Sequence, residues 1–174
     1  MSAWACVGAL AGMVAIETQI AVFSEDEELQ LNIDLGALLD AIGEAVIVCD
    51  AKGAVVLWNR GAERMFGYTE TEALGGTLDM IIPERLRKRH WDGYNKTMET
   101  GITRYGNDLL RVPAVNKAGS AMSIAFTVAM LHGPDGKVTG IASVIRDETA
   151  RFAEERALKK KVSELETEIA SGSS

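Results

Sequence analysis

The sequence predicts an α+β fold: a five-stranded antiparallel sheet with helices on one face, flanked by N-terminal and C-terminal helices. Two short strand-like runs meet at a turn near Gly53, several short helical segments follow, and three longer strand-like runs come last. Strands joined by tight turns pair antiparallel, and the helices between them then cover one face of the sheet. We expect this domain over residues 36–147, between a flanking segment (1–35) and an amphipathic helix with its tail (148–174).

The composition is typical of one globular domain with attached segments. Of 174 residues, 47% are hydrophobic and 25% are charged. A formal net charge of −7 argues against general binding to nucleic acid or to an anionic membrane. Cys6 and Cys49 form no CxxC pair, so neither a disulfide framework nor a zinc site is predicted, and a cytoplasmic setting is expected.

An apolar run covers residues 3–16, ahead of an acidic stretch between Ser24 and Glu28. The run is too short for a membrane span, and no basic region precedes it as a secretory signal requires. We expect a helix that packs on another surface, such as a second copy of the chain. A membrane-tethered N-terminus is the alternative.

Periodicity and turn residues define the first half of the domain. The expected elements are a short amphipathic helix over 35–42, strands over 45–50 and 54–58, a helix from Asn59 to Phe66, a turn from Thr69 to Gly76 and a helix from Pro83 to Gly101. Pro83 suits a helix start because its missing N–H costs nothing in the first turn.

The second half is expected to form strands over 104–116, 122–131 and 138–146, joined by turns at 117–120 and 133–136. Pro113 interrupts the first of these strands, which indicates a sheet edge or a bulge. A charged helix over 147–169 completes the chain. A short coiled-coil seam recurs along this helix at Leu158, Val162, Leu165 and Ile169.

His90 is the residue most informative about function. In the helix after Pro83, Leu86, His90 and Tyr94 recur at four-residue steps and share one face. The opposite face carries charged residues: Arg85, Lys88, Arg89, Asp92 and Lys96. One of only two histidines thus lies in an apolar stripe, whereas His132 adjoins a turn.

Several separate segments resemble those of PAS domains. They are Glu44–Val48 at the start of the core, Trp58-Asn59-Arg60, Phe66-Gly67-Tyr68 and the strand-ending Ile145–Thr149. The resemblance covers roughly residues 36–150. It implies a sensory or dimerisation module rather than an enzyme, and we find no catalytic motif that indicates otherwise.

The segment from Pro83 to Tyr94 further resembles the haem-binding PAS oxygen sensors of the FixL type, whose axial histidine lies seven residues after the proline that opens the helix. The resemblance implies b-type haem with His90 as the iron ligand, and a neutral imidazole on an apolar face can supply that ligand. It implies haem walls made of Ile82, Leu86, Tyr94, Tyr105, Leu110, Ile124, Phe126 and Val128, with Lys96 and Arg104 at the propionates. Each wall residue fits ordinary core packing as well, and the two basic residues fit solvated surface. A flavin photoreceptor would carry an Asn-Cys-Arg-Phe segment after Gly75, and residues 75–79 contain no cysteine.

The oxygen-sensing relatives carry a distal arginine nine residues before a turn glycine. Counting back from Gly119 gives Leu110, with Arg111 next to it and directed to the other face of a regular strand. A bulge at Pro113 would shift the register and bring Arg111 inside. Without a bulge, we expect a preference for CO or NO, or weak oxygen binding.

Two functions are therefore compatible with the sequence. In the first, a haem-binding homodimer senses a diatomic gas or redox state and signals through its flanking helices to a separate partner. In the second, the chain is a cofactor-free interaction or dimerisation module, or it binds an apolar metabolite.

Overall fold

The computed structural model describes residues 33–103 and 108–172. Of the described residues, 33–38 belong to one unit and those from Leu39 onward to a second, and helix α1 (Leu35–Ala41) crosses the boundary between them. The predicted apolar run and acidic stretch lie outside the described residues. None of the described helices is long and apolar enough to cross a membrane.

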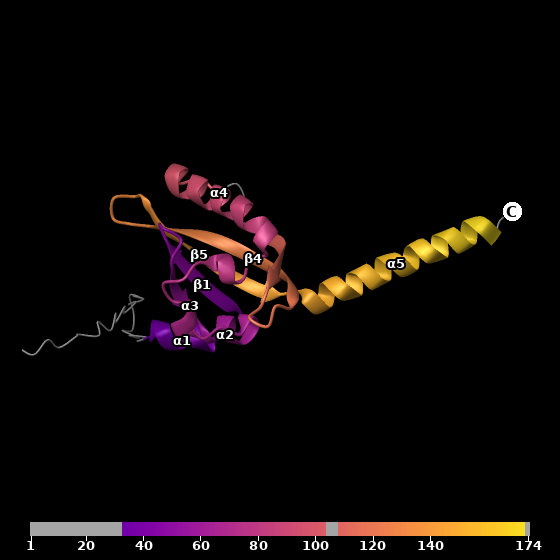
Figure 1. The fold of residues 1–174 in the computed structure, drawn as a ribbon, viewed down its shortest axis with the longest axis horizontal. Helices are drawn as coiled ribbons and strands as arrows, with labels where there is room; N and C mark the ends of the chain where they lie inside the picture. The colour runs from indigo at the N-terminus through magenta and orange to yellow at the C-terminus, as the bar shows by residue number, and fades with distance from the viewer. Residues whose placement is uncertain (1–32, 104–107, 173–174) are drawn as a thin grey trace, which may run out of the picture. The chain divides into compact units, whose positions relative to one another are not determined.

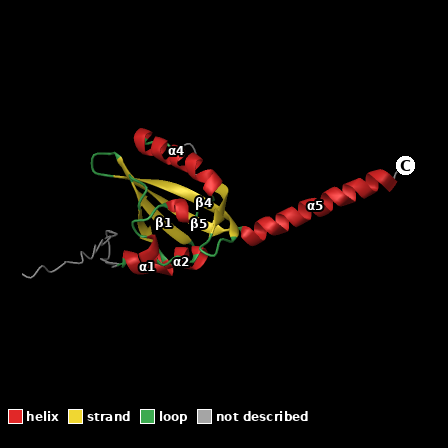
Figure 2. Ribbon diagram, viewed as in Figure 1, coloured by secondary structure: helices red, strands yellow, loops and turns green. Residues whose placement is uncertain are grey.

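Five strands form one antiparallel sheet in the order β2-β1-β5-β4-β3 (Figures 1 and 2). The strands are β1 (Ala45–Asp50), β2 (Val55–Trp58), β3 (Leu110–Val115), β4 (Ala121–His132) and β5 (Val138–Asp147). The helices are α2 (Arg60–Phe66), α3 (Glu70–Ala73), the short 3₁₀ helix η1 (Leu78–Met80), α4 (Glu84–Thr100) and α5 (Thr149–Gly172). The predicted fold class, a five-stranded antiparallel sheet with helices, is confirmed.

One face of the sheet packs against the helices and forms the core. Ile47 of β1, Ile145 of β5 and Ile124 of β4 contribute from the sheet, and Phe66 of α2 and Tyr94 of α4 contribute from the helices. Side chains alternate along each strand, so the intervening residues of β1, β4 and β5 face the opposite side.

Asn59 joins α2 to β1 from a buried position, with 4% of its surface exposed. Its Oδ1 accepts hydrogen bonds from the N–H groups of Ala62 (2.9 Å) and Val46 (2.8 Å), and its Nδ2 donates to the carbonyls of Leu39 (2.8 Å) and Glu44 (3.1 Å). The first bond caps α2, the bond from Val46 fixes α2 against β1, and the other two reach Leu39 of α1 and Glu44 just before β1.

β3 differs from the strand expected over 104–116. It begins at Leu110, because Asp108 and Leu109 lie outside the ladder and aspartate is unfavourable in strands. The β3–β4 pairing runs without a register shift from Leu110 opposite Phe126 to Val115 opposite Ala121. Of the two positions proposed for Pro113, the sheet edge is therefore observed and the bulge is absent.

β3 is an edge strand, and its outer side is partly covered. The N–H of Val115 points away from β4 and donates to the carbonyl of Ile81 at 2.9 Å. Pro113, two residues earlier, has no N–H to offer.

Candidate functional site

Three contacts hold helix α4 in place. The Trp91 indole Nε1 donates to Asp79 Oδ1 at 2.8 Å, and the Tyr94 hydroxyl donates to the carbonyl of Asp50. The Trp91 ring also lies so close to Gly53 that a Cβ at that position would be 2.5 Å from it. Since Gly53 has a φ of +83°, glycine is required there on both grounds. These contacts attach α4 to η1 and to the β1–β2 turn.

His90 lies midway along α4, and its Nε2 atom is buried without a hydrogen-bond partner among the described residues. Its ring meets Trp91 edge-on, with 4.8 Å between the ring centroids. Desolvation by burial lowers the pKa of His90 below its ordinary 6.5, against the opposing charge of Asp79. The imidazole is therefore neutral at pH 7. A buried polar atom without a partner costs folding free energy, so a ligand that engages it would be stabilising.

The expected wall residues of the sheet lie on its helix-packed face. Ile124 is buried, and Phe126 and Val128 follow it at alternate positions along β4. Leu110 is the cross-strand neighbour of Phe126, so it shares this face. Ile82, just before α4, packs against the same core. Ile124, Phe126 and Ile82 thus pack in one core, and Leu110 and Val128 lie on the same face of the sheet.

Of the other expected site residues, some lie on the same face of α4 as His90 and others do not. Tyr94 is buried one turn after His90, and Leu86 is half-buried one turn before it. Lys96 is exposed and lies about 120° around the helix axis from His90, so the two do not share a face. Outside the described residues lie Arg104 and Tyr105.

Arg111 is directed away from the interior. It lies opposite Ala125 in the β3–β4 register, and its Nε is 2.9 Å from Glu148 Oε2. Because alternation along β3 is unbroken, the adjacent residues Leu110 and Arg111 face opposite sides of the sheet. The inner position is occupied by the apolar residue.

Glu148 connects β3 and β4 to the start of α5. Its carboxylate pairs with Arg111 and also with Arg151 Nη1 at 2.8 Å. Its N–H donates to the carbonyl of Ser123, whose own N–H donates to Thr149 Oγ1. The hydrogen bond from Arg111 is the main cause that lowers the pKa of the Glu148 carboxyl. We did not predict this role from the sequence; the available signal was an acidic residue within the strand-ending segment.

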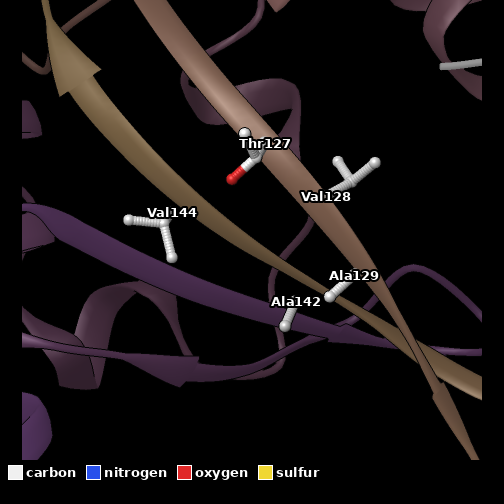
Figure 3. A pocket seen from close by; sticks show the side chains of 5 residues that line it. All are labelled: Thr127, Val128, Ala129, Ala142 and Val144. Atoms are coloured by element: carbon white, nitrogen blue, oxygen red, sulfur yellow. The ribbon is translucent and has the colours of Figure 1, made fainter. Parts of the chain in front are cut away.

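A shallow depression of about 310 Å³ lies over β4 and β5 and shares only Val128 with the expected wall (Figure 3). Its lining residues are Thr127, Val128, Ala129, Ala142 and Val144. None of them is titratable, so the depression offers shape and apolar surface but no reactive group. Within the described ranges, no three His, Cys, Asp or Glu side chains come together to hold a metal ion.

A family profile described as the PAS fold matches residues 34–147, well over half of the chain. The chain belongs to the PAS family. The chain is 32% identical over 160 residues, or 91% of its length, to an uncharacterized protein of Azorhizobium caulinodans. It is 38% identical over 76 residues (40% of this chain) to the sensor protein FixL of Bradyrhizobium diazoefficiens, and 27% identical over 108 residues (62%) to the oxygen sensor protein DosP of Escherichia coli. The chain spans 20%, 15% and 13% of the lengths of these three relatives.

Solved structures share the fold of this PAS domain. A PAS domain from Colwellia psychrerythraea aligns with a TM-score of 0.58 at 21% identity, covering 66% of this chain and 93% of that one. An RNA-binding light-oxygen-voltage receptor aligns with a TM-score of 0.60 at 19% identity, covering 74% of this chain and 36% of that one. At these identities the likeness concerns the fold alone.

The PAS domain without a ligand should lose stability on acidification because of His90. The unfolded imidazole takes up a proton as the pH falls through about 6.5, whereas the buried one resists protonation. Folding stability from this group is therefore full above pH 6.5 and declines below it. Urea unfolding at pH 8 and pH 5.5 should show a smaller acid-induced loss in His90→Leu than in the unmodified chain. Equal losses in the two proteins would mean that the His90 ring is solvated.

Proposed function

We propose that this PAS domain is a sensor that binds b-type haem through His90. The observation that carries the proposal is the His90 Nε2 atom, which is buried, has no hydrogen-bond partner in the described part of the chain and belongs to a neutral imidazole. The spacing from Pro83 and the likeness to the sensor protein FixL support the same conclusion. A haem supplies four of its iron's ligands itself, so one protein imidazole is sufficient.

The neighbouring residues fit such a group. Leu86 and Ile82 on the helix side, and Ile124, Phe126 and Val128 on the strand side, would keep water from the macrocycle. When bound, the haem would supply an iron able to take a diatomic gas or to change oxidation state. Flavin photochemistry lacks comparable support because the only cysteine in the described residues, Cys49, lies on β1.

Expression of the full chain with an adequate haem supply tests this proposal. The purified protein should show an intense Soret band and a haem-to-protein ratio near one. If the protein is colourless and does not take up added hemin, the alternative is favoured: a cofactor-free interaction module or a binder of an apolar metabolite.

Leu110 is proposed to lie on the distal side, where it offers no hydrogen-bond donor. Dioxygen on ferrous haem carries partial negative charge that needs a donor, whereas bound CO is nearly neutral. We therefore expect the ferrous protein to bind CO readily, and to bind oxygen weakly or oxidise quickly in air.

Substitutions at adjacent β3 positions test this distal assignment. Leu110→Arg should strengthen oxygen binding by about tenfold, the scale of a charge-assisted hydrogen bond. Arg111→Ala should change it less than twofold, because Arg111 pairs with Glu148 on the other face. Optical titration of the ferrous proteins with oxygen and with CO measures both effects. A large loss of oxygen affinity in Arg111→Ala would show that Arg111, not Leu110, faces the bound gas.

We propose that ligand binding causes a conformational change that is transmitted from the pocket along β3. A ligand that displaces Leu110 also moves Arg111, its neighbour in the chain, and with it the ion pair to Glu148 at the start of α5. The chain would act as a homodimer through its flanking helices and pass the change to a separate signalling partner. The likeness to the oxygen sensor protein DosP supports a diatomic gas as the signal.

A further inference from the structure

We propose that Trp91, held by Asp79 and Gly53, is a positioning residue that fixes the orientation of the His90 imidazole. The proposal rests on the proposed haem binding through His90 and adds the residues that direct its Nε2 atom. It begins from the contact between the two rings. Their centroids are 4.8 Å apart and their planes cross at 81°, so the rings meet edge-on.

The helix alone does not produce this contact between His90 and Trp91. Successive residues of an α-helix project about 100° apart around its axis, and their side chains do not face each other. The contact therefore depends on groups outside α4 that hold the indole in place. The structure shows two such groups, a carboxylate on η1 and the backbone of the β1–β2 turn.

The carboxylate of Asp79 holds the polar edge of the indole. It accepts a hydrogen bond of 2.8 Å from Trp91 Nε1. Asp79 is itself attached to α4, because Arg87 Nη2 donates to the Asp79 carbonyl at 2.9 Å and Arg87 Nε donates to the Ile82 carbonyl at 3.2 Å. Since Arg87 lies one turn before Trp91, two neighbouring side chains of α4 contact Asp79.

Gly53 holds the other end of the indole. An ideal Cβ on Gly53 would lie 2.5 Å from Cζ3 and 2.8 Å from Cη2 of Trp91. The six-membered ring of the indole therefore packs directly on the backbone of the turn. Because Nε1 and Cζ3 lie on opposite sides of the indole, contacts at both atoms leave the ring one orientation.

Tyr94 is a second fixed ring beside the imidazole. Its centroid is 6.1 Å from that of His90 and 5.5 Å from that of Trp91. Its hydroxyl donates to the carbonyl of Asp50. Two rings that are each held by a hydrogen bond thus restrict the rotation of His90.

A fixed imidazole matters because a histidine binds iron through one atom in one direction. Residues that orient a ligating histidine typically contribute about 10- to 100-fold to metal affinity. In this chain Trp91 takes that part by packing against the His90 ring. Asp79 acts on His90 only through Trp91.

Transfer of hemin from the haem-loaded full chain to an excess of apomyoglobin tests this role. Asp79→Ala should raise the rate of haem loss by about tenfold, the lower end of the effect of an orienting residue. Asp79→Asn keeps an acceptor oxygen for the indole and should stay within about twofold. The matched control is Asp92→Ala, which removes an exposed carboxylate that pairs with Lys88 on α4 and should also stay within about twofold.

Trp91→Phe removes the same hydrogen bond from its other end. Phenylalanine retains a ring but has no N–H, so haem loss should rise at least as much as in Asp79→Ala. The double variant should lose haem no faster than Trp91→Phe alone, because both substitutions remove one interaction. Additive effects would show that Asp79 acts by a route other than Trp91 and would overturn the proposal.

Nuclear magnetic resonance of the full chain prepared without haem separates positioning from stability. At pH 8 the imidazole signals of His90, assigned by their absence in His90→Ala, should be displaced from those of an unfolded histidine by the neighbouring aromatic rings. Asp79→Ala should move these signals toward the unfolded values, whereas Asp79→Asn should not. Unchanged signals in a folded Asp79→Ala chain would overturn the proposal.

The outcomes distinguish this proposal from the haem proposal on which it rests. A chain that takes up no haem overturns both. A chain that binds haem through His90, but in which Asp79→Ala changes neither haem loss nor the imidazole signals, retains the haem proposal and overturns only the positioning role of Trp91.

Discussion

His90→Ala is expected to abolish the Soret band, or to reduce haem retention through gel filtration by at least tenfold. The imidazole would be the only protein atom on the iron, and alanine leaves both the ligand and its space vacant. The measurement is the absorption spectrum and haem-to-protein ratio after purification. His132→Ala is the matched control, because this second histidine is exposed at the end of β4 and should leave the spectrum unchanged.

Rescue with free imidazole separates ligation from a structural role of His90. Imidazole added to His90→Ala should enter the vacated space and restore a six- or five-coordinate spectrum. Alanine at a merely structural histidine would not show such recovery. An unaltered spectrum in His90→Ala would show that another residue ligates the iron, and it would refute the assignment of His90.

Asn59→Ala is expected to lower the free energy of unfolding by about 3 kcal/mol, the upper range for a buried polar network. The substitution removes four hydrogen bonds and leaves the Val46 N–H and the Leu39 and Glu44 carbonyls without their partner. Urea unfolding followed by circular dichroism measures the change. Asn95→Ala, at an exposed position on α4, should cost less than about 0.5 kcal/mol.

A serine at the same position divides the effect into two parts. Asn59→Ser can still cap α2 through Ala62, and it should recover about 1 kcal/mol of the loss. It is too short to reach Leu39 and Glu44 as well. Full recovery by serine would mean that only the helix cap matters and that the bonds to Val46, Leu39 and Glu44 contribute nothing.

Local signals were sufficient for most of the elements. A helix was predicted from Asn59 to Phe66, and the structure shows Asn59 as the N-cap of α2 and Gly67, the residue after Phe66, as its C-cap. Alternation and turns predicted β4 and β5 to within one or two residues. Each of these signals depends on residues that are close together in the sequence. The four-residue spacing that places His90 on the apolar face of α4 is a signal of the same kind.

Features that depend on distant residues could not be predicted in this way. β1 lies between β2 and β5, and no local pattern relates Ala45 to its partner Ile145 a hundred residues later. The approach of Trp91 to Gly53 is likewise set by packing between separate elements. The beginning of β3 at Leu110 was missed, although Asp108 just before it is unfavourable in a strand. For the candidate site, the sequence predicted the face on which His90 lies, but burial of its Nε2 required the tertiary structure.

The outer side of β3 has a consequence for aggregation. In an antiparallel ladder, every second residue directs its N–H and carbonyl away from the neighbouring strand, and on β3 these residues are Arg111, Pro113 and Val115. Proline offers no donor, and the Val115 N–H is already bonded to Ile81. Of the three outward positions, only Arg111 therefore has a backbone N–H that could pair with a strand of a second molecule, and its side chain is charged. The β3 edge of the sheet is therefore poorly suited to pairing with the sheet edge of a second copy.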